Sequence, residues 1–218
     1  MGCRGSRGCL GFCWGVQFER GWLLGLLSPI VSDGIKKRLK KKELQESFLN
    51  DLNDLRGRLI ANASLIIMKF GNLNREMLEW IQSNKHFIQE YKPGAFERIN
   101  SLLELDDRKL AELNRIQKNL GSDALFLPLL KLPFIDSNIN YISIFDSKYQ
   151  KQILDIRSQL HFLNEQIEQN RYYFKMTFDS DIKGDNYEII SKNLINSYLE
   201  ISIISKLIIT KIENFSNQ

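Results

Sequence analysis

The stretch YQKQILDIRSQLHFLNEQI, residues 149–167, carries its apolar residues at alternating steps of four and three. The repeating positions are Tyr149, Ile153, Ile156, Leu160, Leu163 and Ile167. This heptad spacing gives an α-helix one narrow apolar stripe, which is stable only when it is buried against another helix. The sequence therefore predicts a helix over about residues 147–178 with one packed face.

Two further segments show the same spacing. Within residues 34–70 the stripe consists of Phe48, Leu52, Leu55, Leu59, Asn62 and Ile66. Within residues 185–214 it consists of Leu194, Ile201, Ile208 and Phe215, widened by Ile190, Tyr198, Ile204 and Ile212. A short polar turn at 179–185 predicts that the last two helices are antiparallel neighbours. At about 30 residues each, these helices would be roughly 45 Å long.

These patterns predict an all-α fold, an elongated antiparallel helical bundle of three to four long coiled-coil-like helices. The spacing leaves open whether partner helices come from the same chain or from a second copy. Asn62 and Asn170 lie within or beside the stripes. A buried Asn fixes helix register, whereas an Asn at the edge of a stripe stays solvated, and the sequence does not separate these two cases.

Helix boundaries are visible between the first and third of these segments. Gly71 and Asn72 predict a stop, and Asn74 predicts the cap of a second helix that extends to Tyr91. Pro93 and the glycine after it predict a break. A third helical region is expected over 95–119.

Within that third region we expect a kink near Leu105 and Asp106, because Asp106 resembles a helix cap, and an end at Gly121. Residues 122–145 are apolar but are interrupted by Pro128 and Pro133, which disfavour both a long helix and a central strand. We predict an extended crossover packed on the bundle, followed by a short helix near 135–143. The alternative is an exposed docking segment.

Charge is distributed unevenly along the chain. Residues 1–42 contain nine Lys/Arg against two acidic residues, a balance of +7, whereas residues 43–218 contain 21 against 24, a balance of −3. The bases concentrate in one run: Lys36, Lys37, Arg38, Lys40, Lys41 and Lys42. A nucleic-acid-binding protein usually spreads cations over a face. A compact run next to an apolar segment is more typical of a membrane boundary, so we expect no nucleic-acid partner.

The apolar segment before the run predicts a membrane anchor formed by Trp22, Leu23, Leu24, Leu26, Leu27, Ile30 and Val31. The flanking Trp22 and the cations after it would orient the chain with its amino terminus out and its body cytoplasmic. The uninterrupted apolar run is only about half of the roughly 20 residues that a span requires. Three arrangements remain open: a single span over residues 16–35, an interfacial anchor, and an amino-terminal helix buried in the bundle.

The first fifteen residues differ in composition from the rest. They are rich in Gly, Cys and Arg, whereas the body is rich in Lys, Asn and Ile, which is consistent with a start assigned too far upstream. The opening Met1-Gly2-Cys3-Arg4-Gly5-Ser6 also fits an acylation pattern. We predict three regions: an atypical extension at 1–15, the anchor and basic run at 16–42, and a helical bundle at 43–218.

No motif predicts catalysis, a metal or a cofactor. The cysteines Cys3, Cys9 and Cys13 all lie near the amino terminus, so no disulfide framework is expected in the body. Arg157, His161 and Glu165 form a row at helical spacing. Helical RNases of the HEPN type place at least four residues between their Arg and His, whereas this chain has three. An i, i+4 polar row on a helix surface is the interpretation that we favour.

The sequence thus predicts a non-enzymatic, membrane-tethered cytoplasmic bundle that acts by protein association, as a scaffold, sensor or assembly factor, with a protein partner or a second copy bound through its helices. One alternative is a membrane-acting toxin or defence effector. Another is a soluble helical nuclease or nucleotide-binding protein.

Overall fold

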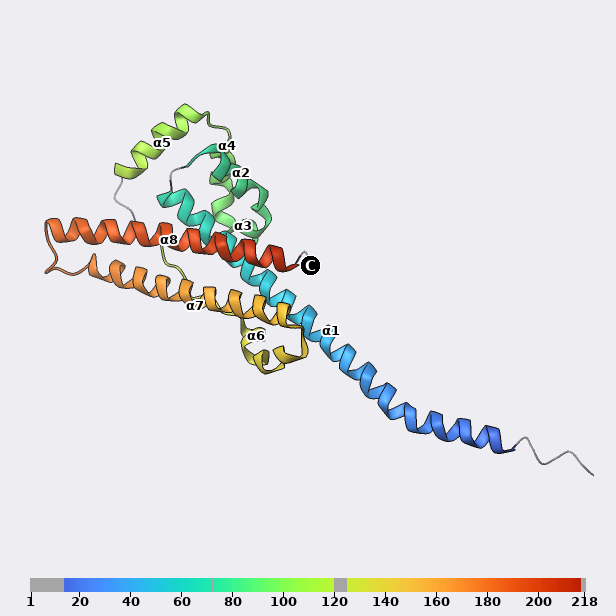
Figure 1. Ribbon diagram of the computed structural model, residues 1–218. Helices are drawn as coiled ribbons and strands as arrows, with labels where there is room; N and C mark the ends of the chain where they lie inside the picture. The colour runs from blue at the N-terminus through green and yellow to red at the C-terminus, as the bar shows by residue number, and fades with distance from the viewer. Residues whose placement is uncertain (1–13, 72, 120–124, 217–218) are drawn as a thin grey trace, which may run out of the picture. The chain divides into compact units, whose positions relative to one another are not determined.

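The computed structural model describes the backbone of residues 14–71, 73–119 and 125–216, and the side chains in these ranges except at 14–32, 95, 96, 98 and 117–119. Across these ranges the regular secondary structure consists of α-helices and short 3₁₀ helices, with no strand (Figure 1). The all-α prediction is confirmed. The chain divides into two compact units, Met1–Glu46 and Ser47–Gln218.

Three long helices carry the core of the second unit. They are α1 (Trp14–Phe70) from Ser47 onward, α7 (Ser147–Met176) and α8 (Asp185–Ser216). Nearly all of the predicted stripe positions are buried, and only Tyr149 and Ile204 keep partial exposure. Asn62 and Asn170 are also buried, so the stripes contain polar groups.

Helices α7 and α8 lie side by side and run antiparallel, as the short turn between them predicts (Figure 1). Asp155 and Lys211 form an ion pair across the two helices. Further along, Asn170 Nδ2 donates to Ser197 Oγ at 2.6 Å. Residue numbers rise along α7 as they fall along α8, and the buried Asn170 fixes this register with a hydrogen bond.

The second unit's part of α1 is also antiparallel to α8. Arg56 Nη2 donates to Glu213 Oε1 at 2.6 Å, and the Phe70 ring stacks on Tyr198 with centroids 4.4 Å apart. The three long helices therefore form one bundle in which α8 runs opposite to both α1 and α7.

Aromatic side chains fill one end of this bundle. Phe48 contacts Phe134 and Phe145, each with ring centroids 5.8 Å apart. Tyr149 stacks on Phe145 at 4.4 Å and contacts Phe215 at 4.8 Å. Burial raises the pKa of the Tyr149 phenol to about 12. The phenol therefore stays neutral at physiological pH.

The helix predicted from Asn74 to Tyr91 begins where expected but does not run unbroken. Asn74 accepts a hydrogen bond from Met77 N at 2.8 Å, which confirms the cap. The chain then breaks at Asn84, giving α2 (Arg75–Ser83) and α3 (Lys85–Tyr91). Asn84 Nδ2 donates to Trp80 O at 2.9 Å, and this competition with the helical backbone bonds explains the break.

The break at Pro93 is confirmed as a 3₁₀ turn, η1 (Pro93–Ala95). The kink expected near Leu105 is a full separation into α4 (Phe96–Leu103) and α5 (Asp107–Asn119). Asp106 Oδ1 accepts from Lys109 N at 2.8 Å, as a cap does. The predicted stop at Gly121 lies outside the described residues.

Residues 125–132, hereafter the crossover segment, have no regular secondary structure, and α6 (Pro133–Asn138) and η2 (Ile139–Ile144) follow them. The leucines at 127, 130 and 132 are buried, which confirms the packed crossover over the described part of 122–145. Phe126 is exposed, with Arg171 over its ring at 4.9 Å from the centroid. The expected short helix is α6, which continues as a 3₁₀ helix.

At two residues of the crossover segment, one side chain bonds to both the backbone N–H and the backbone carbonyl. Tyr198 Oη accepts from Leu125 N at 2.9 Å and donates to Leu125 O at 2.6 Å. Asn164 accepts from Leu130 N at 2.9 Å and donates to Leu130 O at 2.8 Å. Because an extended backbone lacks internal hydrogen bonds, these contacts supply partners for the backbone groups of Leu125 and Leu130 where the segment lies against the bundle.

Helix α3 packs closely on α1 at Gly57. A Cβ on Gly57 would lie 2.6 Å from Tyr91 Cε2 and 3.0 Å from Phe87 Cδ1. Tyr91 Oη also donates to Asp54 Oδ1 at 2.7 Å, and Arg56 lies over the Phe87 ring. The missing side chain is therefore what permits this contact.

We expect Gly57→Ala to lower the free energy of unfolding by about 1–3 kcal/mol, the usual cost of overpacking. On an open helix surface the same change would instead stabilise by roughly 1 kcal/mol. Urea unfolding followed by circular dichroism measures the sign of the change in the free energy of unfolding. Gly34→Ala is the control, because no atom of the described residues lies within 4 Å of its added Cβ. A Gly57→Ala protein as stable as the parent would contradict the close contact.

Asp51 of α1 gives a second stability test. Its buried carboxylate accepts from Ile135 N at 2.9 Å, at the start of α6. Burial raises the pKa of Asp51 above 3.8, although the N–H groups of Ile135 and Phe134 offset part of the rise. Since the pKa of Asp51 is higher in the folded state, the folded state binds the proton more tightly than the unfolded state. The free energy of unfolding therefore falls as pH rises from the unfolded pKa, near 3.8, through the higher folded pKa.

We therefore expect Asp51→Asn to remove this fall in stability, because the amide keeps an acceptor for Ile135 without the buried charge. Asp51→Ala should lose about 1–3 kcal/mol, since it leaves a buried N–H unpaired. Urea midpoints at pH 4, 5, 6 and 7 would separate the variants. If the parent gained stability relative to Asp51→Asn as pH rose, the result would contradict a raised pKa of Asp51 in the folded state.

Candidate functional site

The predicted basic run is part of α1 in the first unit of the chain. Five of its six cations have exposed side chains, and Lys41 is half-exposed. The helix passes through the run without a break. A stretch of this charge density attracts anions, with each cation near an anionic membrane surface contributing about 1 kcal/mol.

Two apolar side chains lie in the same stretch and are also solvent-accessible. Ile35 is 53% exposed and Leu39 is 55% exposed. They are one helical turn apart, so they share a face. Lys42 Nζ lies 3.7 Å from Glu46 Oε1, in a solvated i, i+4 pair that contributes little to stability. The stretch therefore combines a dense positive charge with exposed apolar surface.

The predicted anchor residues, from Trp22 to Val31, fall within α1, but their side chains lie outside the described residues. Of the predicted extension at 1–15, residues 1–13 lie outside the described residues altogether, and only the backbone of residues 14 and 15 is described, at the start of α1. In the part of the chain that the structure describes, no helix combines the length and apolar character needed to cross a membrane.

The row of Arg157, His161 and Glu165 does not come together as a site. Arg157 Nε donates to Asp136 Oδ1 at 2.7 Å, so this arginine links α7 to α6. His161 and Glu165 are exposed on the helix surface. In the described ranges, no group of three or more His, Cys, Asp or Glu side chains is arranged to hold a metal ion.

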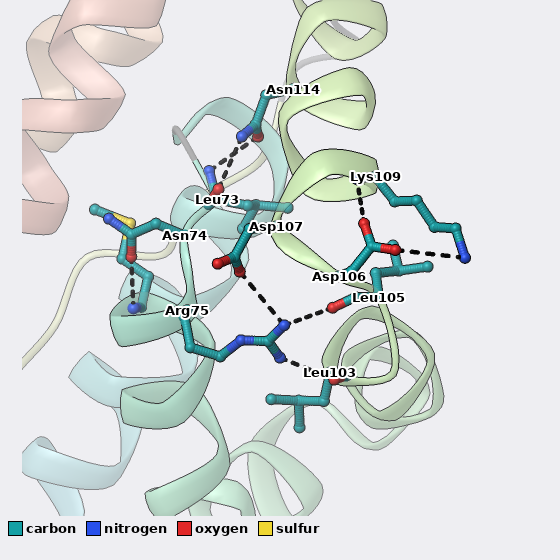
Figure 2. A network of polar contacts seen from close by, with 10 residues as sticks. Leu73, Asn74, Arg75, Leu103, Leu105, Asp106, Asp107, Lys109 and Asn114 are labelled. Carbon is teal, nitrogen blue, oxygen red and sulfur yellow. Dashed lines mark hydrogen bonds and ion pairs between the residues drawn. The ribbon is translucent and has the colours of Figure 1, made fainter.

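A denser polar network joins the start of α2 to the junction of α4 and α5 (Figure 2). Arg75 Nη1 donates to Leu103 O at 2.9 Å and Nη2 to Leu105 O at 2.6 Å. The same guanidinium lies 3.5 Å from Asp107 Oδ1. A cation at the carboxyl end of a helix complements the helix dipole, so Arg75 acts as a cap for α4.

Asn114 of α5 completes this network. It accepts from Leu73 N at 2.9 Å and donates to Leu73 O at 2.8 Å (Figure 2). An open depression of about 450 Å³ lies here, lined by residues that include Arg75 and Asn114. Because both polar side chains already bond to backbone groups, the arrangement is explained by holding α5 on α2, without a ligand.

Sequence reasoning missed these contacts. Arg75 and Leu103 are separated by 28 positions and Asn114 and Leu73 by 41, so no local spacing relates them. Sequence reasoning also did not single out Ile35 and Leu39, although their i, i+4 spacing beside the cations is the signal that would have identified them.

Comparisons with protein families, with curated proteins and with solved structures found no match to this chain.

If Arg75 serves the fold, Arg75→Gln should lower the free energy of unfolding by about 1 kcal/mol or more, because the carbonyls of Leu103 and Leu105 lose a charged donor. The exposed Arg108 on α5 is the matched control, and Arg108→Gln should change stability by less than about 0.5 kcal/mol. Urea titration of the parent and both variants measures these changes as shifts of the unfolding midpoint. Equal midpoints for parent and Arg75→Gln would contradict the capping role.

Proposed function

We propose that this chain is a membrane-tethered helical bundle that acts by protein association, as a scaffold, sensor or assembly factor, and not by catalysis. In this proposal residues 16–42 attach the chain to a bilayer and the bundle recruits a protein partner or a second copy. The observation that carries it is the run of six Lys/Arg within one helix, five of them exposed, ahead of a bundle whose own charge balance is −3 over residues 43–218.

Charge separation of this kind favours a membrane surface. A cationic segment is drawn to anionic headgroups, while a slightly acidic body is repelled from them and stays in the aqueous phase. The apolar residues from Trp22 to Val31 supply hydrophobic attachment next to the cations. Cations after the apolar segment support an orientation with the amino terminus out and the bundle cytoplasmic.

The bundle surface supports association with a protein. Helix α8 exposes Ile203 (66%) and Leu207 (48%), one turn apart, and α7 exposes Leu154 (44%) and Phe162 (47%). Exposed apolar side chains at helical spacing are the usual anchors of helix-mediated contacts. Arg157 is already bonded to Asp136, which gives no support to the nuclease alternative.

Membrane fractionation tests the proposal. The full chain and a truncated chain beginning at Glu43 are expressed untagged, and the membrane fraction is washed with high salt and then with alkaline carbonate. We expect the full chain to stay with membranes through the salt wash and the truncated chain to be released on lysis. Recovery of both chains in the soluble fraction would contradict the tether.

A further inference from the structure

The six cations of the basic run are not spread evenly around α1. At about 100° per residue, Lys42 and Lys36 bound a sector of about 120° that contains Ile35 and Leu39 and none of the run's cations. The other four cations occupy the rest of the circumference. The exposed apolar pair therefore lies in a gap between two lysines, whose long side chains can reach past it.

The same sector changes character after Lys42. The next residues to fall in it are Glu43 and Glu46, at about 80° and 20° from Ile35. Both carboxylates are exposed, and Glu46 pairs with Lys42. An anionic surface would attract this face as far as Lys42 and repel it from Glu43 onward.

We propose that residues 33–42 of α1 form a binding face for anionic phospholipids. In this arrangement Ile35 and Leu39 insert between headgroups, Lys36 and Lys42 beside them reach the lipid phosphates, and Glu43 with Glu46 ends the contact. This inference rests on the proposed tether and adds to it the lipid class and the side of the helix that faces the bilayer.

The combination of cations with exposed apolar side chains favours a lipid surface as the partner of this face. An interfacial helix needs apolar side chains flanked by cations, which is the arrangement at Ile35 and Leu39. A phosphodiester backbone would use the cations alone and leave those two side chains in water, so RNA explains less of the stretch.

The test uses the full chain with two vesicle types, one of pure phosphatidylcholine and one that also contains phosphatidylglycerol. Chains that float with each vesicle are treated with a neutral lysine-acylating reagent, and labelling is measured residue by residue by mass spectrometry. We expect the lysines at 36–42 to react about tenfold more slowly on the anionic vesicles, because of contact with headgroups. Exposed Lys148, Lys151 and Lys192 of the bundle are internal controls and should react equally on both.

Two variants separate the apolar from the electrostatic contribution. Ile35→Ser with Leu39→Ser should abolish most of the protection, because the helix no longer inserts. Ile203→Ser with Leu207→Ser removes an equally spaced exposed apolar pair from α8 and should leave the protection intact.

The failures are distinguishable. Flotation on both vesicle types with equal labelling would overturn the lipid-binding face and leave the tether standing. Failure to float with either vesicle would overturn the tether and the face together. Equal protection by single-stranded RNA, unchanged in the Ile35→Ser and Leu39→Ser protein, would overturn the face in favour of a polyanion site.

Discussion

Burial of three apolar stripes against one another is the constraint on which the second unit depends. Leu59 of α1, Leu163 of α7 and Ile208 of α8 have no solvent exposure, and each belongs to a heptad stripe that would face water if its partner helices were absent. A buried leucine or isoleucine stabilises the fold by about 1.5–3 kcal/mol. In proteins most of the stability of a helix comes from such packing, and less of it from intrinsic helix propensity.

Once the three helices are fixed, polar side chains on them determine where the irregular backbone can lie. Tyr198 and Asn164 each pair with both backbone groups of one residue in the crossover segment, and Asp51 accepts from the first turn of α6. Asn114 likewise pairs with both backbone groups of Leu73 within the second unit. Without such partners each buried N–H or C=O would cost about 1–3 kcal/mol. The apolar crossover is therefore held by its backbone as well as by its leucines.

The first unit differs from this in its physical character. Its described side chains, at residues 33–46, include exposed charges and the exposed apolar pair Ile35 and Leu39, whereas the bundle buries its apolar stripes. Exposed apolar side chains beside cations gain free energy on contact with an anionic bilayer, which supplies both a hydrophobic layer and phosphates. The stripes of the bundle are already buried, although apolar side chains outside them, such as Ile203 and Leu207 of α8, remain exposed. In the proposed function, attachment and folding therefore depend on different parts of the sequence.

The sequence by itself determined the long helices, their buried faces and the caps at Asn74 and Asp106, because these depend on residues within a few positions of one another. It also located the basic run, whereas the exposure of Ile35 and Leu39 beside that run came from the structure. Only the tertiary structure decided the break at Asn84, the capping of α4 by Arg75 and the binding of the crossover by Tyr198, which lies 73 positions from Leu125. Such contacts depend on where distant helices meet. A local pattern carries no information about a partner that folding alone brings within hydrogen-bonding distance.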